Sequence, residues 1–174
     1  MDATDRELIL KLLTESRQAF LASAAGLTDE QAKLCPAPDQ WSVLDCVEHV
    51  AITDHFMFTV ITTQLAPAPP SGDRSREEFL LRELTNRTRK INAPDRARPT
   101  GRFPTLAAAL EQFIQSRAHS IGYVEQCDKD LRACTAPHPL MGPITGQEYL
   151  IILALHPARH AAQIREVRNT LGLS

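Results

Sequence analysis

Two histidines, His156 and His160, stand four residues apart in the segment LALHPARHAAQI at residues 153–164. On a helix, side chains at this spacing project from the same face, one turn apart. Paired imidazoles of this kind form a bidentate platform for a borderline metal ion such as zinc. Hydrogen-bonded core histidines produce the same pattern, so the pair alone leaves both interpretations open.

The helical pattern places both histidines on the side that should face the protein core. They share one stripe with the apolar residues Ile152, Ile164, Val167 and Leu171. A buried imidazole needs partners for both ring nitrogens, since an unsatisfied buried polar group costs about 1–3 kcal/mol. Pro157, between the histidines, cannot donate a hydrogen bond to the carbonyl of Leu153. We expect that carbonyl to accept a bond from water or a ligand, or the helix to bend there.

A metal site needs a third protein ligand, and His49 and His55 lie on a helix predicted for residues 42–65. Six residues separate these two histidines, which turns them away from each other, so only one can join the pair. Asp45, one turn before His49, has two roles open to it. It can accept a hydrogen bond from the His49 ring and orient it, or it can simply cap the helix.

Few side chains are available to transfer protons near such a site. Asp45, Asp54 and Tyr149 lie on the two helices that would carry the histidines. Gln163, three residues after His160, could orient a ligand or merely pack. This scarcity favours the alternative of a non-catalytic metal- or ligand-binding bundle.

Residues 82–102, RELTNRTRKINAPDRARPTGR, contain seven Lys or Arg residues and two acidic residues. A solvated helix and loop explains this basic segment, and so does a surface that steers an acidic thiol or a carboxylate substrate to the metal. The sequence argues against nucleic acid as a partner, because few aromatic residues accompany these charges and the net charge of the chain is -2.

The elements that would position these residues are all helices, since no segment alternates with the period of a strand. Periodicity and capping residues predict four principal helices, over residues 4–25, 42–65, 105–127 and from the capping box at 145–148 to Gly172. Shorter helices are expected after the capping box at 28–31 and over 75–92. With a long connection between the second and third principal helices, the chain should form an all-α four-helix bundle, as a single domain over residues 1–174.

The composition is that of a soluble globular protein, with 43% hydrophobic and 23% charged residues. The start, MDATDRELIL, lacks a signal-peptide pattern, and the longest apolar run, YLIILAL, is far too short to cross a membrane. Cys46 is expected to be a buried apolar residue rather than a reactive thiol. The absence of any CxxC pair indicates reduced thiols and a cytoplasmic protein, for Cys35, Cys46, Cys127 and Cys134 alike.

Two segments together resemble the DinB-like family. Its members share W-S-x-x-[DE]-x-x-x-H at the start of the second helix and H-x-x-x-H-x-x-Q-I in the last. The order and helical placement of both motifs fit the whole chain, although Pro157 departs from the usual residue at its position. The matching residues are Trp41, Ser42, Asp45 and His49 in WSVLDCVEHV, and His156, His160, Gln163 and Ile164 in HPARHAAQI.

The resemblance implies a four-helix bundle, often dimeric, with one divalent metal held by three histidines at an end of the bundle. Carried over residue by residue, the ligands are His49, His156 and His160. Three ligands leave positions open for water or substrate, and imidazole suits zinc or nickel, with manganese and iron as alternatives.

Family members with assigned activities resemble either metal-dependent hydrolases or enzymes that use low-molecular-weight thiols. We therefore expect a homodimeric, metal-dependent enzyme that acts on a small molecule. Its reaction would be S-transfer of a low-molecular-weight thiol to an electrophile, or hydrolysis.

Overall fold

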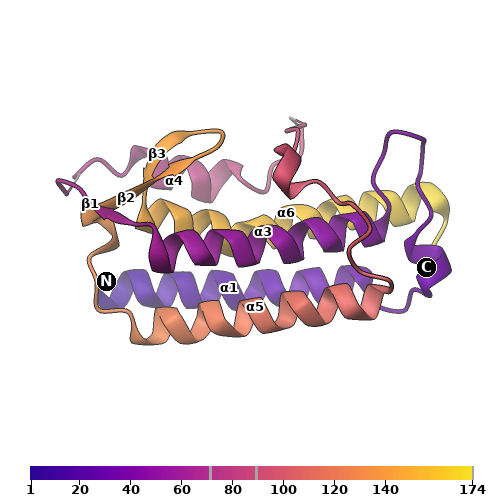
Figure 1. Ribbon diagram of the computed structural model, residues 1–174, viewed down its shortest axis with the longest axis horizontal. Coiled ribbons are helices and arrows are strands. Elements are labelled where there is room, and N and C mark those ends of the chain that lie inside the picture. The colour runs from indigo at the N-terminus through magenta and orange to yellow at the C-terminus, as the bar shows by residue number, and fades with distance from the viewer. Residues whose placement is uncertain (71, 89, 174) are drawn as a thin grey trace.

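The computed structural model describes residues 1–70, 72–88 and 90–173, and residue 89 of the basic segment lies outside these ranges. Helices α1 and α3 each pack against both α5 and α6. Together they form the predicted four-helix bundle (Figure 1). The four long helices are α1 (Ala3–Ala24), α3 (Val43–Thr63), α5 (Leu106–Gln126) and α6 (Gly146–Leu171).

The directions of the helices require a long connection between α3 and α5. Helices α1 and α6 run one way along the bundle, and α3 and α5 run the other way (Figure 1). The chain therefore leaves α3 at one end and must return to the other end before α5 begins. A helix of 21 residues spans about 30 Å, so residues 64–105 travel most of the bundle's length. On the way, α4 (Ser75–Glu83) packs on α6 and the 3-10 helix η1 (Asp95–Ala97) packs on α3.

Capping residues set the ends of the two helices that carry the histidines. Ser42 with Asp45 begins α3, and Thr145 with Glu148 begins α6, each pair forming a complete capping box. Gly172 ends α6 in the left-handed conformation, with φ of 65°. These predicted boundaries are confirmed to within two residues.

The shorter helices agree less well with expectation. Helix α2 (Asp29–Ala32) follows the predicted capping box, which begins at Thr28. The helix expected over residues 75–92 was too long, because α4 ends at Glu83. Beyond it the Asn86 side chain accepts a hydrogen bond from the amide of Thr88 at 3.0 Å, which stabilises a turn in place of a further helical one.

The expectation of a chain without strands was wrong at one end of the bundle. Three short strands form an antiparallel sheet in the order β1-β2-β3. Strands of two, five and four residues are too short for alternation to be visible, and prolines in all three further obscure the pattern. They are β1 (Ala66–Pro67), β2 (Cys134–His138) and β3 (Gly142–Thr145), and the last two, with the 3-10 helix η2 (Leu131–Ala133), join α5 to α6.

A layer of buried polar residues divides the core into two apolar clusters. One cluster includes Leu13, Met57, Val124 and Leu150, and the other includes Phe20, Val47, Phe113 and Ile164. Along each helix a polar residue stands between the two sets, and the layer consists of Ser16, Asp54, Ser116, Arg117, Ser120 and His160. None of the helices within the described ranges has the length and apolar character that a membrane-spanning segment requires.

The centre of this polar layer is an ion pair between Arg117 and Asp54, whose side chains are both fully buried. Arg117 Nη2 donates to Asp54 Oδ1 at 2.7 Å and to the carbonyl oxygen of Leu153 at 3.0 Å. That carbonyl is the one that Pro157 leaves without an amide donor. Helix α6 continues through Pro157. The donor to the Leu153 carbonyl is the Arg117 guanidinium of α5, in place of the water or ligand expected from the sequence.

We expect Arg117→Met to lower the free energy of unfolding by about 3–5 kcal/mol, because it leaves the Asp54 carboxylate buried without its partner. Urea unfolding followed by circular dichroism measures this change. The matched control is Lys11→Met, which breaks an exposed pair with Glu15 and should change stability by less than about 0.5 kcal/mol.

The double variant Arg117→Met/Asp54→Leu should recover most of that loss, because it removes both charges together. The remaining cost should come from the Leu153 carbonyl, and adding Pro157→Ala should reduce it by restoring a backbone donor. A single Arg117→Met variant as stable as the wild type would contradict the importance given to this ion pair.

Candidate metal centre

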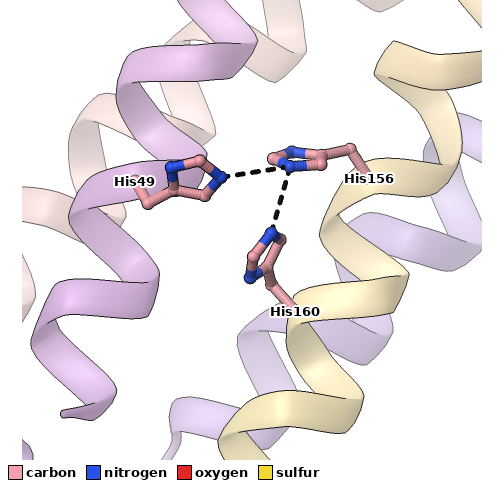
Figure 2. Close-up of side chains that lie close together, drawn as sticks. All are labelled: His49, His156 and His160. Carbon is pink, nitrogen blue, oxygen red and sulfur yellow. Dashed lines mark hydrogen bonds between the residues drawn. The ribbon is translucent and has the colours of Figure 1, made fainter. Parts of the chain in front are cut away.

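The three histidines named by the sequence motifs converge between α3 and α6 (Figure 2). The Nε2 atom of His156 lies 3.2 Å from that of His49 and 3.0 Å from that of His160. One ring nitrogen from each residue lies within 4.8 Å of the others. The cluster lies partway along α6, since His156 and His160 are both well inside that helix, and the expected position at an end of the bundle was wrong.

The tautomer of His49 follows from its outer hydrogen bond. Its Nδ1 lies 2.6 Å from the backbone carbonyl oxygen of Ala97, in η1. A carbonyl oxygen can only accept, so Nδ1 carries the proton and Nε2 presents a lone pair.

The same argument applies to His156 through Thr53. The Thr53 hydroxyl donates to the carbonyl oxygen of His49 at 2.7 Å, which uses its only proton. Its oxygen, 3.3 Å from His156 Nδ1, therefore accepts from that ring. Thr53 stands one turn after His49 on α3, so one side chain links the two ligand-bearing helices.

His160 completes the set with a partner on its own helix. Its Nδ1 donates to the amide oxygen of Gln163 at 2.9 Å. Of the two roles considered for Gln163, the structure thus supports orientation of a ligand, which is the imidazole of His160.

With all three protons on Nδ1, the three Nε2 lone pairs face one another with no hydrogen between them. Such an arrangement repels itself unless a cation lies among the nitrogens. Two imidazoles bound to one ion at about 2.0–2.1 Å lie roughly 3 Å apart, which is the spacing of these Nε2 atoms. The donor set therefore fits a divalent metal ion that prefers nitrogen ligands.

The surroundings keep these imidazoles neutral. Loss of hydration lowers the pKa of His156 and of His160 well below 6.5, and their charged neighbours lower both further. Burial also lowers the pKa of His49, opposed by its bond to Ala97. The indole of Trp41 covers two of the rings, with its centroid 4.9 Å from that of His49 and 6.2 Å from that of His160.

The other candidate residues do not reach the cluster. Asp45 caps α3, accepting from the Ser42 amide at 2.9 Å, so the alternative in which it orients His49 was wrong. Asp54 pairs with Arg117 in the core. Tyr149, at the strand end, donates its hydroxyl to the carbonyl of Pro137.

The cysteines behave as expected from the sequence. Cys35, Cys46, Cys127 and Cys134 are free thiols. Cys46 is fully buried, and burial raises the pKa of its thiol, which therefore stays protonated. It is a small apolar residue of the core, as predicted.

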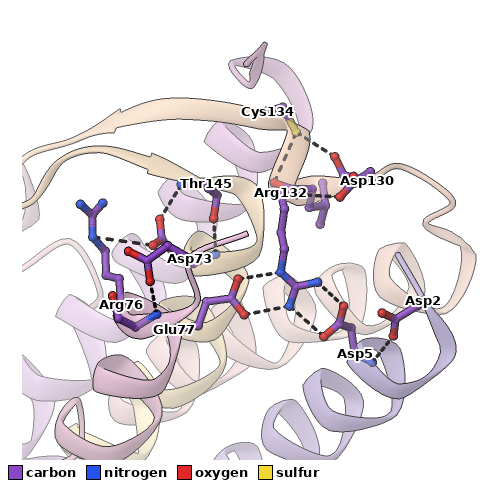
Figure 3. Close-up of polar contacts among 12 residues, drawn as sticks. Asp2, Asp5, Asp73, Arg76, Glu77, Asp130, Arg132, Cys134 and Thr145 are labelled. Atoms are coloured by element: carbon purple, nitrogen blue, oxygen red, sulfur yellow. Dashed lines mark hydrogen bonds and ion pairs between the residues drawn. The ribbon is translucent and has the colours of Figure 1, made fainter. Parts of the chain in front are cut away.

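A second group of polar residues lies at the strand end of the bundle, away from the histidines (Figure 3). Arg132 donates two hydrogen bonds to Glu77 of α4 and two to Asp5 of α1, and so ties three elements together. A cavity of about 340 Å³ lies beside Arg132 and Asp5. Because four of the five N–H groups of the guanidinium are bonded to two carboxylates, we interpret this group as a structural clamp rather than a reactive site.

The sequence profile of the DinB superfamily matches residues 12–164. Among curated proteins, the uncharacterised protein YuaE of Bacillus subtilis (strain 168) is 20% identical over 162 residues, which cover 93% of this chain and 98% of YuaE. The similarity to this relative therefore extends over nearly the whole length of both proteins.

Solved structures share the fold at low sequence identity. YfiT from Bacillus subtilis, described as a probable metal-dependent hydrolase with an unusual four-helix bundle topology, is 18% identical with a TM-score of 0.65, over 100% of this chain and 91% of YfiT. The four-helix bundle protein TT2238 is 21% identical with a TM-score of 0.61, over 92% and 98%. A conserved protein from Enterococcus faecalis is 19% identical with a TM-score of 0.63, over 99% of both chains.

These structural likenesses establish the four-helix bundle, and the profile covers most of the chain. The two motifs that suggested the family lie on α3 and α6 and bring their histidines together. The chain belongs to the DinB superfamily.

Proposed function

We propose that this protein is a metal-dependent hydrolase that acts on a small molecule, with a divalent ion held by His49, His156 and His160. The observation that carries the proposal is the convergence of three Nε2 atoms, 3.2 and 3.0 Å apart, on histidines whose Nδ1 atoms each have an oxygen partner elsewhere. The description of YfiT, which shares the fold, as a probable metal-dependent hydrolase agrees with it.

Three protein ligands suit a catalytic ion better than a structural one, because a structural zinc ion is bound by about four protein ligands and has no open position. When bound, such an ion supplies Lewis acidity, which acidifies water or a thiol and polarises an electrophile. The protein's own contribution is to hold the ligands. Ala97, Thr53 and Gln163 fix the three rings, and Trp41 covers two of them against solvent.

Transfer of a low-molecular-weight thiol is the second candidate reaction. Burial is the main cause of the lowered pKa of His160, and the positive charges of Arg87 and Arg159 add to it, so two cationic side chains lie near this ligand. A positive field favours an anionic group at the ion, and a thiolate is one. The basic segment, which carries Arg87, thus supports the expectation that it attracts an acidic substrate or thiol.

Zinc and nickel remain the proposed ions because all three ligands are imidazoles, with manganese and iron as alternatives. The homodimer and the cytoplasmic location likewise remain proposals. A sedimentation experiment on the metal-loaded protein tests the first, and cell fractionation tests the second.

Purified protein should contain about one equivalent of a divalent metal, which His49→Ala and His160→Ala should each remove. Elemental mass spectrometry on untagged protein measures the content, and hydrolysis of ester and amide panels should fall with it. His55→Ala is the matched control, because His55 is an exposed histidine on the same helix. Retention of full metal content in both ligand variants would exclude this site, and metal without hydrolysis or thiol transfer would leave a binding bundle.

The metal-free protein should lose stability as the pH falls. The pKa values of the three imidazoles lie below 6.5 in the folded chain, whereas the unfolded chain titrates near that value. As the pH falls below 6.5, the unfolded state binds more protons, and the free energy of unfolding decreases.

Urea unfolding of metal-free protein between about pH 8 and pH 5 measures this dependence. The variant His156→Leu/His160→Leu should show a shallower decline, since two of the responsible groups are gone. An equal decline in both proteins would show that other groups cause it.

A further inference from the structure

The long connection between α3 and α5 is attached to the ligand-bearing helices at several points. Midway along it, just after α4, Arg159 of α6 donates to the carbonyl oxygens of Leu84 and Asn86. Near its end, the amides of Thr100 and Arg102 donate to the buried carboxylate of Glu48, on α3 beside His49, at 2.6 and 3.0 Å. The connection is therefore held against the candidate metal centre from both sides.

Between these attachments, Arg87 reaches across to α6. Its Nε and Nη2 donate to the two carboxylate oxygens of Glu166 at 2.8 and 2.7 Å. Its remaining terminal nitrogen, Nη1, donates to the amide oxygen of Gln163 at 3.2 Å. The Arg87 side chain is 20% exposed against 57% for Glu166, so the guanidinium lies on the inner side of the pair.

The amide oxygen of Gln163 is thus shared by two donors, Arg87 and His160 Nδ1. A glutamine amide has an acceptor end and a donor end, and only the acceptor end can receive the His160 proton. Arg87 can bond only to the acceptor end as well, because a guanidinium offers donors alone. It therefore fixes which way the amide points, and Glu166 fixes Arg87 by a bidentate pair.

We propose that Arg87 is a positioning residue for the candidate metal centre, acting through Gln163 to hold His160 with its proton on Nδ1 and its lone pair towards the ion. Together with the carbonyl of Ala97, this gives the connection control of two of the three imidazoles. The consequence for metal affinity rests on the proposed function, whereas the consequence for the tautomer does not.

The direction in which metal affinity changes in an Arg87 variant shows whether Arg87 acts by positioning His160 or by its charge alone. A cation near a metal ion repels it, so removal of the Arg87 charge alone should strengthen metal binding. Loss of a partner that orients a ligand weakens metal binding, by about 10–100-fold in other proteins. The two roles therefore predict opposite changes.

Zinc affinity measured by competition with a chromophoric chelator tests this difference. Arg87→Met should weaken binding by about tenfold. Arg87→Lys should bind as weakly, since one ammonium cannot span Gln163 and Glu166 as the planar guanidinium does. The matched control is Arg82→Met on α4, which removes the same charge from an arginine that is 69% exposed and bonded to its neighbour Glu83, and it should leave the affinity unchanged.

A measurement on metal-free protein tests the positioning step by itself. Nitrogen-15 chemical shifts of the His160 ring should report a single Nδ1–H tautomer in the wild type and a mixture in Arg87→Met. Arg87→Met/Gln163→Glu should restore the single tautomer, because both ends of a carboxylate accept.

The outcomes distinguish the two proposals. An unchanged His160 tautomer in Arg87→Met, or a zinc affinity that rises in Arg87→Met or returns to the wild-type value in Arg87→Lys, would overturn the role of Arg87. A tautomer that depends on Arg87 in a protein that binds no metal would leave that role standing and would overturn the metal-dependent function.

Discussion

The buried ion pair between Arg117 and Asp54 is the interaction on which the arrangement of the bundle depends. Pro157, placed between two converging histidines, removes the backbone donor for the Leu153 carbonyl, and Arg117 supplies one from α5. Asp54, on α3, neutralises that guanidinium. The residue before it in the sequence, Thr53, contacts Nδ1 of His156. Three atoms of the pair, Asp54 Oδ2 and Arg117 Nε and Nη1, find no partner among the described residues. The pair therefore specifies how three helices align more than it adds stability.

Helix direction decides what covers the candidate metal centre. Because α3 and α5 run the same way, the chain between them must travel back along the bundle, and it lies beside α3 and α6 where the histidines converge. That route brings the carbonyl of Ala97 to His49 and the guanidinium of Arg87 to Gln163. A bundle with short loops alone would have no segment to supply these contacts. The direction of the helices thus determines which residues surround the histidines, because it determines the route of the connection.

The sequence predicted the parts of the structure that local rules control. Capping residues and helical periodicity located the long helices, and the spacing of His156 and His160 placed both on one face. His49 came from the resemblance between motifs. The strands were not predicted, because segments of two to five residues are too short to show alternation. The role of Ala97 was not predicted either, because it depends on a backbone carbonyl, which every residue has. The contact of Thr53 could have been predicted from helical spacing, since Thr53 stands one turn after His49.

Arg87 and Arg117 mark the limit of local rules, because each acts across a long separation in sequence. Arg87 looked like one charge of a solvated basic segment, and only the path of the connection brings it to α6. Arg117 looked like an ordinary helical arginine until the proline on another helix gave it a carbonyl to complete. In both cases the sequence contains a group that no neighbouring residue can satisfy. For Arg117 it is the Leu153 carbonyl, which lacks an amide donor because of Pro157, and for Arg87 it is the Gln163 side chain, whose amide could point either way. Tertiary structure meets each requirement with an arginine from another element. Arg117 donates to the Leu153 carbonyl, and Arg87 donates to the Gln163 amide oxygen that also accepts from His160.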